Sequence, residues 1–217
     1  MSSHAIATPN PRGRMDKRQA MLDAALVVFA REGYAQATVD QIATEAGVAK
    51  PTIYAHVGDK ETLFRLALTE TAARANGKTL ALLKSFPTDP RDLRGELTAV
   101  AQQIVPCMVD EQSTAVRRLV SAEAVRLPGL FEAVRSSGAE EIIEALAGRL
   151  ARLANAGHLE VRDPVVAASQ FIALIAGDLP MMAVVSPHRI TEAEREQVVA
   201  DGVETFLRAF ARHDAAS

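Results

Sequence analysis

Apolar side chains recur at intervals of three and four residues along most of this 217-residue chain, and this spacing limits the fold more than any other feature. A period near 3.6 residues is typical of amphipathic helices, and no convincing alternation of apolar and polar residues predicts a strand. Glycine and proline fall at the ends of the periodic segments. Hydrophobic residues make up 48% of the chain, enough for a real core. The sequence therefore predicts an all-α fold.

Three helices are predicted in quick succession near the N-terminal end. The first runs from Asp16 to Glu32 and ends at the glycine that follows it. Thr38 caps the second, with Gln41 at the capping-box position. Gly47 then supplies a tight turn, and Pro51 lies in the first turn of the third helix, where its missing N–H has no partner to lose. Two short helices joined by a glycine turn predict a helix-turn-helix motif.

Longer helices are expected in the rest of the chain. One starts at Lys60 and continues to the region of Gly77, and the clearest loop runs from Ser85 to Asp92. Pro106 and Pro180 lie inside apolar helical runs, so each should kink or break its helix. We divide the chain into a basic arm expected to be disordered (1–15), a helix-turn-helix domain (16–70) and a C-terminal helical bundle (71–217). The later helices are expected at Leu93–Val109, Gln112–Arg126, Gly129–Ala156, Pro164–Val185 and Glu192–His213.

Several functional classes are disfavoured by composition. The chain has no uninterrupted run of about eighteen apolar residues and no secretory signal, so we expect a cytoplasmic protein without a membrane span. Its single cysteine, Cys107, cannot form an intramolecular disulfide, and no Cys and His cluster has metal-ligand spacing. We therefore expect no metal and no cofactor. No nucleophile motif or paired-carboxylate spacing stands out, which argues against an enzyme.

The charges are distributed unevenly around a net value of −3. Residues 1–60 hold seven basic and six acidic side chains, and the remainder holds 17 basic and 21 acidic ones. On the third helix, Ile53 and Val57 are four apart and face inward, which leaves the polar side chains free for a DNA groove. Lys60 begins the next helix, where a cation and N-terminal amides form a natural phosphate site. These features favour a DNA-binding N-terminal domain and a different task for the acidic remainder.

Two stretches carry a specific resemblance. RQAMLDAALVVFAREGY and TVDQIATEAGVAKPTIYAHVGDKETLF cover roughly Lys17 to Leu68. They resemble the first helix and the DNA-binding signature of the TetR family of bacterial transcriptional regulators. The resemblance implies that the helix at Lys50 is the recognition helix. Val57 stands where many members carry phenylalanine, a packing change, and Ala55 stands where a larger polar residue is common, a change that bears on operator preference.

The resemblance also implies which side chains contact DNA. Tyr54 has the alternative of a core aromatic with an exposed hydroxyl, and His56 that of a solvated surface histidine. Whether His56 and Thr52 contact bases or phosphates stays open. Arg12, Arg14 and Arg18 either follow the DNA backbone or minor groove or solubilise the terminus. Carried over position by position, the contacts are Thr38, Lys50, Pro51, Thr52, Tyr54, His56 and Lys60.

The remainder of the chain, from about Ala75, resembles a recurrent type of TetR regulatory domain in RRLVSAEAVRLPGLFEAVRSSG and LARLANAGHLEVRDPVVAASQFIALIAGD. The resemblance implies an effector pocket and a dimer interface formed by the last two long helices. No fixed cationic cluster is found among the pocket candidates, so we expect a small, mostly apolar effector. The ligand-binding candidates are Gln103, Ile104, Cys107, Met108, Leu119, Glu123, Phe131, Phe171 and Asp178. The dimer-interface candidates are Phe171, Leu174, Ile175, Met182, Val199, Val203, Phe206 and Phe210. Each apolar candidate has the alternative of plain core packing.

The leading hypothesis is a homodimeric repressor that binds a palindromic operator in double-stranded DNA and leaves it when a small molecule fills the second domain. A transcriptional activator of the same fold is a variant of this hypothesis, because the sequence does not encode the sign of control. An enzyme dependent on Cys107 and a purely helical interaction module are the alternatives from other classes. Cys107 itself has two further interpretations, an inert buried thiol and a redox sensor.

Overall fold

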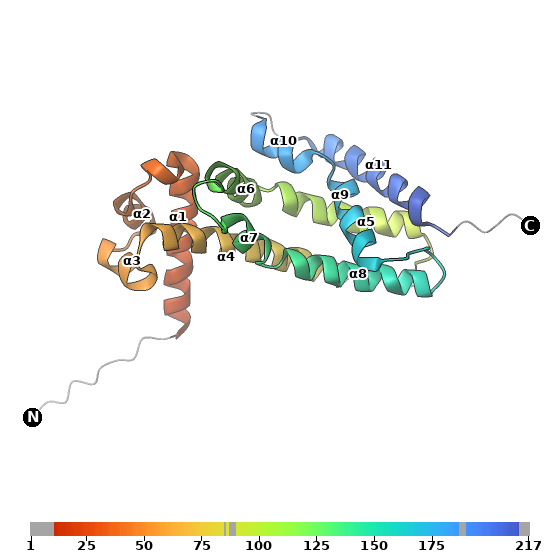
Figure 1. Ribbon diagram of the computed structural model, residues 1–217, viewed down its shortest axis with the longest axis horizontal. Coiled ribbons are helices and arrows are strands. Elements are labelled where there is room, and N and C mark those ends of the chain that lie inside the picture. Colours follow the sequence, from red (N-terminus) through yellow and green to blue (C-terminus); the bar gives the residue numbers. More distant parts are fainter. Residues whose placement is uncertain (1–10, 85, 87–89, 187–189, 213–217) are drawn as a thin grey trace, which may run out of the picture. The chain divides into compact units, whose positions relative to one another are not determined.

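The computed structural model describes residues 11–84, 86, 90–186 and 190–212, with side chains from residue 17 onward in these ranges. Within them the chain is helical and has no strand beyond one isolated bridge between Leu159 and Ala211, which confirms the predicted all-α class. The chain divides into two compact units, residues 1–70 and 71–217, and the division falls within a single helix. The described helices (Figure 1) are α1 (Pro11–Gln36), α2 (Val39–Ala46), α3 (Lys50–Val57), α4 (Lys60–Leu83), α5 (Leu93–Val109), α6 (Glu111–Glu123), α7 (Leu130–Arg135), α8 (Ala139–Asn155), α9 (Pro164–Ala176), α10 (Leu179–Val185) and α11 (Glu192–Phe210).

The first unit packs α1 on α2 and α2 on α3. α1 begins at Pro11, so residues 11–15, which were expected to belong to the arm, are helical; residues 1–10 lie outside the described residues. The predicted stop at Gly33 is a break with φ 77° and ψ 161°, after which one more helical turn follows. Aromatic rings then close the core: Phe64 lies 4.8 Å from Phe29 and 4.7 Å from Tyr34 between ring centroids. α1 and α4 thus share an aromatic contact within the unit that also contains α2 and α3.

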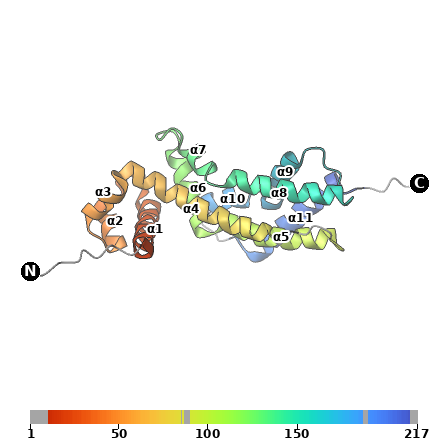
Figure 2. The same ribbon diagram turned by 90° about the horizontal axis from the view of Figure 1, so that it is seen from below.

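The second unit is built around α9, which packs on α8 and on α11, while α5 packs against α11 (Figures 1 and 2). Phe171 of α9 meets Phe206 of α11 edge to face, with ring centroids 5.0 Å apart. The two helices are close at Gly202, because a Cβ atom there would lie 2.8 Å from the Cα of Ile175. A residue larger than glycine would therefore force the helices apart at this crossing.

Two segments that were each expected to be one helix are two. Gly129–Ala156 holds α7 and α8, which are separated at Gly138, where φ is 119°. Pro164–Val185 holds α9 and α10, and Pro180 stands in the first turn of α10. The expected break at Pro180 is confirmed, because a proline fits a first turn and not a helix interior. Pro106, in contrast, lies inside α5, which continues to Val109.

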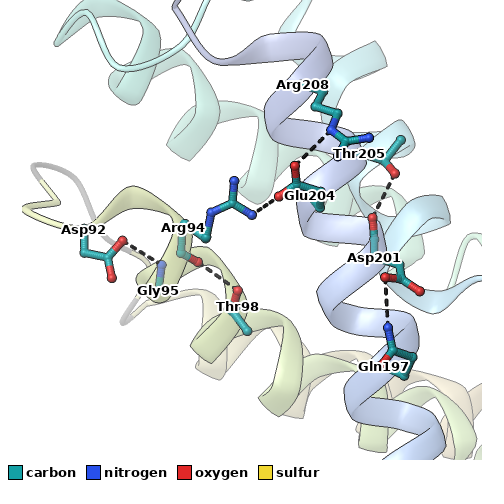
Figure 3. Close-up of polar contacts among 9 residues, drawn as sticks. All are labelled: Asp92, Arg94, Gly95, Thr98, Gln197, Asp201, Glu204, Thr205 and Arg208. Atoms are coloured by element: carbon teal, nitrogen blue, oxygen red, sulfur yellow. Dashed lines mark hydrogen bonds and ion pairs between the residues drawn. The ribbon is translucent and has the colours of Figure 1, made fainter.

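A polar network joins α5 to α11 (Figure 3). Arg94 donates a hydrogen bond to Glu204 of α11, which also accepts one from Arg208 Nε at 2.9 Å. Arg94 first, and then Arg208, hold the pKa of Glu204 below its ordinary value. Asp92 caps α5 by accepting from the Gly95 N–H at 3.0 Å. Charged side chains therefore connect the surface of α11 to the start of α5.

The length and hydropathy of the described helices bear on membrane insertion. No single helix there is both long and apolar enough to cross a membrane, and α9 with α10 meets the length and composition criteria only as a pair bent by 48°. Much of α9 lies in the core: Ala167, Ala168, Phe171 and Ile175 have no exposed surface.

Candidate nucleic-acid interface and ligand cavity

The α2–turn–α3 segment is fixed by caps at each junction. Thr38 accepts a hydrogen bond from the Gln41 N–H at 3.2 Å, and the Gln41 side chain accepts one from the Thr38 N–H at 2.8 Å, which confirms the predicted capping box. Gly47 ends α2 in the left-handed region with φ 63° and ψ 32°, as its predicted turn requires. Pro51 lies in the first turn of α3. The turn chemistry read from the sequence therefore produces a helix-turn-helix.

α3 is anchored by two side chains and presents the others. Ile53 and Val57 are buried at 1% and 8% exposure, as the four-residue spacing predicted. Tyr54 is 43% exposed, so its ring is not a core aromatic. Lys50 and Pro51 are also exposed, and Thr52 and His56 are half-buried. The polar face of α3 is therefore open in the way that a helix in a major groove requires.

Lys50 does not stand alone on this face. Its Nζ lies 2.8 Å from Oδ2 of Asp40, a residue in the first turn of α2. This hydrogen bond is the main reason that the pKa of Lys50 lies above its ordinary value. Both side chains are substantially exposed, so the pair is easily exchanged for another anion such as a phosphate. The Lys50 ammonium is thus exposed at the surface and oriented by its ion pair with Asp40.

Lys60 is positioned by the end of α1. Its Nζ lies 4.8 Å from the centroid of the Tyr34 ring and donates to the Ala35 carbonyl oxygen at 3.3 Å. The α4 amides are engaged differently from the sequence expectation, since Asp59 Oδ1 accepts from the Thr62 N–H at 2.7 Å. This backbone hydrogen bond is the largest cause of the lowered pKa of Asp59. A phosphate at the start of α4 would meet the Asp59 carboxylate, which already accepts from a backbone N–H there. The group available to bind a phosphate at this helix end is therefore the Lys60 ammonium rather than the backbone amides.

Three residues of this surface were missed by sequence reasoning: Asp40, Tyr34 and Asp59. A Ser, Thr or Asp just before a helix is a recognised cap signal, so Asp59 could have been found from its place before Lys60. Asp40 and Tyr34 lie 10 and 26 positions away from the lysines that they contact, and no local pattern signals such pairs. Arg18, a candidate for the DNA arm, donates to Glu70 Oε2 at 2.7 Å and lies in α1. Arg12 and Arg14 lie where the side chains are not described.

The second unit contains a cavity of about 280 Å³ between α4, α6, α7 and α8. Among the predicted ligand-binding residues, only Phe131 lines it. Ile104 and Phe171 have no exposed surface and belong to the core between α5, α8, α9 and α11, and Leu119 is buried as well. Glu123 is 8% exposed, and its Oε2 has no hydrogen-bond partner among the described residues. Side chains that fill a core leave no space beside them for a ligand, so most of the predicted ligand-binding positions do not line this cavity. It is lined by Thr71, Ala72, Ala75, Asn76, Ser113, Val116, Arg117, Val120, Ser121, Phe131, Val134, Arg135 and Ala139.

The other pocket candidates lie outside this lining. Gln103 is exposed on α5 and donates to the Ala99 carbonyl at 3.3 Å. Cys107 and Met108 are half-buried near the end of α5, and Asp178 is exposed between α9 and α10. Burial is the largest cause of a raised pKa of the Cys107 thiol. A raised pKa disfavours the thiolate, which is the form that reacts.

The predicted dimer residues fall into two groups. Phe171, Ile175, Val199, Val203 and Phe206 are at most 1% exposed, because α9 and α11 bury them within one subunit. Leu174, Met182 and Phe210 retain partial exposure. Other large apolar side chains of α9 and α10 have about half or more of their area exposed: Val165, Val166, Met181 and Val185. In the described residues, no group of three or more His, Cys, Asp or Glu side chains is placed to hold a metal ion.

The fold and this surface together define a helix-turn-helix DNA-binding protein with a separate helical domain. Residues 21–67 match the model of the bacterial regulatory proteins of the tetR family, and residues 95–212 match that of the AefR-like transcriptional repressor C-terminal domain. The chain belongs to the TetR family and is a DNA-binding transcriptional regulator.

Individual relatives agree with this assignment. The transcriptional repressor SCO4008 of Streptomyces coelicolor is 41% identical over 75 residues, which span 35% of each protein. The regulator AcrR of Shigella flexneri is 28% identical over 120 residues, or 55% of this chain and 53% of AcrR. The matches thus span about a third to a half of these curated relatives.

Solved structures match over nearly the whole chain. One, described as a TetR-family transcriptional regulator from Mesorhizobium loti, is 29% identical with a TM-score of 0.84 and is covered completely by 94% of this chain. The flavonoid-responsive regulator FrrA is 31% identical with a TM-score of 0.66, again over 94% of this chain and 100% of FrrA. The similarity therefore includes the second unit as well as the reading helices.

Proposed function

We propose that the protein is a homodimeric repressor that binds a palindromic operator and leaves it when a small, mostly apolar effector enters the second unit. The observation that carries the proposal is the orientation of α3: Ile53 and Val57 are buried and anchor the helix, and its Lys50 and Tyr54 are exposed. SCO4008 and the AcnR proteins of Corynebacterium, which are similar to this chain, are named repressors. Repression is therefore the sign of control that we propose, with activation as the alternative.

We define the reading face as the seven positions proposed to contact DNA: Thr38, Lys50, Pro51, Thr52, Tyr54, His56 and Lys60. Lys50 and Lys60 bind phosphates through their side chains, and Tyr54 donates its exposed hydroxyl to the backbone. Thr38 approaches the DNA at the start of α2, where it also caps the helix. Pro51, Thr52 and His56 complete the surface of α3 that enters the groove. A dimer presents two such helices, which must lie about 34–36 Å apart to enter successive major grooves.

For the dimer we propose the exposed side of α9 and α10. Val166 and Met181 are 48% and 58% exposed in one subunit, and a partner would remove this apolar area from water. Leu174 and Met182 on the same two helices, and Phe210 of α11, are partly exposed and are included in the proposed interface. The proposed role on bacterial operator DNA involves no catalysis and entails a cytoplasmic location.

The experiment that tests the proposal is selection of bound fragments from random duplex DNA by the purified protein. We expect a palindromic consensus, and we expect Lys50→Ala with Tyr54→Phe to reduce affinity for it by at least about tenfold. Lys84→Ala is the control, because it removes one exposed lysine at the end of α4 without touching α3. Failure to enrich any consensus, or equal binding by the α3 variant and the wild type, would contradict the proposal.

A further inference from the structure

The cavity between α4, α6, α7 and α8 is lined mostly by apolar side chains and by two arginines. Its volume of about 280 Å³ is at the small end of ligand pockets. The walls are formed by Val116, Val120, Phe131 and Val134 together with alanines of α4 and α8. No Asp or Glu is among the residues that line it, whereas Arg117 and Arg135 are. An apolar space with arginine and without carboxylate favours a ligand that supplies the missing negative charge.

The two arginines differ in how much of their charge is already balanced. Arg135 Nε and one terminal nitrogen donate to Glu132 at 3.0 and 2.7 Å, and its other terminal nitrogen lies 2.7 Å from Glu140. Its guanidinium is therefore held by two carboxylates. Arg117 donates to the Met108 carbonyl oxygen at 3.2 Å and has no carboxylate within ion-pair distance among the described residues. Of the two lining arginines, Arg117 is the one without a carboxylate partner in the described part of the chain.

Arg117 also lies in a more desolvated place. Burial lowers the pKa of its guanidinium, and the carboxylate of Asp110 only partly opposes this effect. The Asp110 carboxylate is itself engaged, because its Oδ1 accepts from the Ser113 N–H at 2.7 Å as the cap of α6. Removing a charge from water is unfavourable unless a counter-charge is supplied. A ligand carboxylate would supply it through two parallel hydrogen bonds.

The remaining polar groups of the lining are mostly committed to the fold. Ser113 donates its hydroxyl to the Cys107 carbonyl at 2.8 Å, and Asn76 donates its amide to the Ser137 carbonyl at 3.2 Å. Thr71 Oγ1 accepts from Arg74 at 3.2 Å. The cavity thus concentrates its recognition of polar groups at Arg117, with the Ser121 hydroxyl as a second lining group. A ligand with one acidic head and an apolar body matches this arrangement.

We propose that the cavity binds a small monocarboxylic acid, with its carboxylate on the Arg117 guanidinium and its hydrocarbon body against Phe131, Val116 and Val120. This inference rests on the proposed function only in taking the acid to be the effector. The proposed ligand is thus mostly apolar, as expected from the sequence, and carries one negative charge in addition. α4 contributes Thr71 and Asn76 to the cavity and begins at Lys60 in the first unit. A ligand in the cavity therefore acts on the same helix that carries a proposed DNA contact.

The test is calorimetric titration of the full-length protein with 2-naphthoate and octanoate, each compared with its neutral amide. We expect the better of the two acids to bind at least about tenfold more tightly than its amide, as for a charged hydrogen bond. Arg117→Gln should abolish this preference, and Arg117→Lys, which keeps the charge without the fork, should retain part of it. Arg135→Gln is the matched control and should keep the preference, because Glu132 and Glu140 already bind that side chain.

Melting curves of the unliganded variants show whether each is folded, and the Arg117→Lys variant serves if Arg117→Gln is not. Equal binding of acid and amide, no binding of either acid, or a preference that survives in Arg117→Gln overturns the proposal. Operator binding measured with each probe separates the two proposals. An acid that binds through Arg117 without releasing DNA supports the cavity assignment and contradicts the effector mechanism. Release of DNA by the neutral amides alone contradicts the acid assignment and leaves the repressor mechanism standing.

Discussion

At the scale of single residues, the reading face combines cations with nearby carboxylates. Lys50 is paired with Asp40 at 2.8 Å, so a phosphate that approaches this lysine competes with a carboxylate. The same carboxylate repels any phosphate that approaches without the matching geometry. We therefore expect Asp40 to weaken binding to DNA of arbitrary sequence.

This role predicts the behaviour of Asp40→Asn. The variant should bind non-operator duplex roughly threefold or more tightly, with a steeper dependence on salt, because Lys50 is released to bind phosphate. Fluorescence anisotropy at several salt concentrations measures both quantities. Glu45→Gln removes one negative charge from the same helix, but Glu45 lies 3.5 Å from Arg31 and not beside Lys50. An equal gain in both variants would show that net charge, not the Asp40–Lys50 pair, controls the affinity.

Glu204 gives a prediction about acid sensitivity. Its pKa is lowered in the folded protein, mainly by Arg94, so the carboxylate contributes stability above its ordinary pKa and loses that contribution as the pH falls through the lowered value. Glu204→Gln should therefore melt at a lower temperature than the wild type at pH 7, and the difference should shrink between about pH 5 and pH 2. Differential scanning calorimetry at a series of pH values measures it. Glu196→Gln, an exposed change on the same helix, should show no such trend; a pH-independent difference for Glu204→Gln would refute the assignment.

At the scale of elements, α9 and α11 cross closely enough at Gly202 to exclude a side chain there. A Cβ at Gly202 would overlap the Leu174 carbonyl and lie 2.8 Å from Ile175 Cα, and backbone atoms cannot move aside as a side chain can. About one helical turn from this crossing, Phe171 of α9 and Phe206 of α11 depend on the same helix separation for their edge-to-face contact.

Gly202→Ala should consequently lower the free energy of unfolding by about 1–3 kcal/mol, in spite of the higher helix propensity of alanine. Urea denaturation followed by circular dichroism measures the change. Gly148→Ala is the control, since Gly148 lies in α8 and a Cβ there meets nothing within 4 Å. That variant should be neutral or stabilised by up to about 1 kcal/mol. Similar effects at both positions would mean that the close crossing carries no energetic constraint.

At the scale of the whole molecule, the proposed operator mechanism requires two subunits. The apolar side chains exposed on α9 and α10 are the surface we assign to their contact. Val166→Glu should shift the protein towards monomer and reduce operator affinity together, because a buried unpaired carboxylate is costly and one subunit reads only half a palindrome. Analytical ultracentrifugation measures the assembly. Val125→Glu makes the same change at a position that is 93% exposed outside these helices and should leave the protein dimeric. A dimeric Val166→Glu protein would require another interface.

Much of the architecture could be predicted because its signals are local. The Thr38–Gln41 cap, the turn at Gly47 and the buried pair Ile53 and Val57 all depend on residues within about one helical turn of each other. The break at Pro180 follows from the ring of a single residue. The break at Gly138 was missed, and the one expected at Pro180 lies three positions earlier, at Gly177, because a glycine inside a helical pattern signals only a cost until its φ is known.

The candidate site was predicted unevenly for the same reason. The reading helix is continuous in sequence, so its polar face follows from spacing and from the family resemblance. The cavity is assembled from four helices between Thr71 and Ala139, and periodicity cannot distinguish an apolar residue that lines a space from one that fills the core. Ile104 and Phe171 were therefore chosen as pocket residues and are core, while Arg117 was overlooked.

The sequence by itself determined the helices, the helix-turn-helix and the family of this protein, because periodicity, caps and turns are set by neighbours along the chain. Only the tertiary structure decided the partners of the functional charges. It paired Lys50 with Asp40 and Lys60 with Tyr34, balanced Arg135 with two carboxylates, and placed Arg117 in the lining of an apolar cavity with no carboxylate partner among the described residues. The interaction energy of a charged side chain depends on the groups within a few ångströms of it in space. Packing between helices, rather than order along the chain, decides which groups those are.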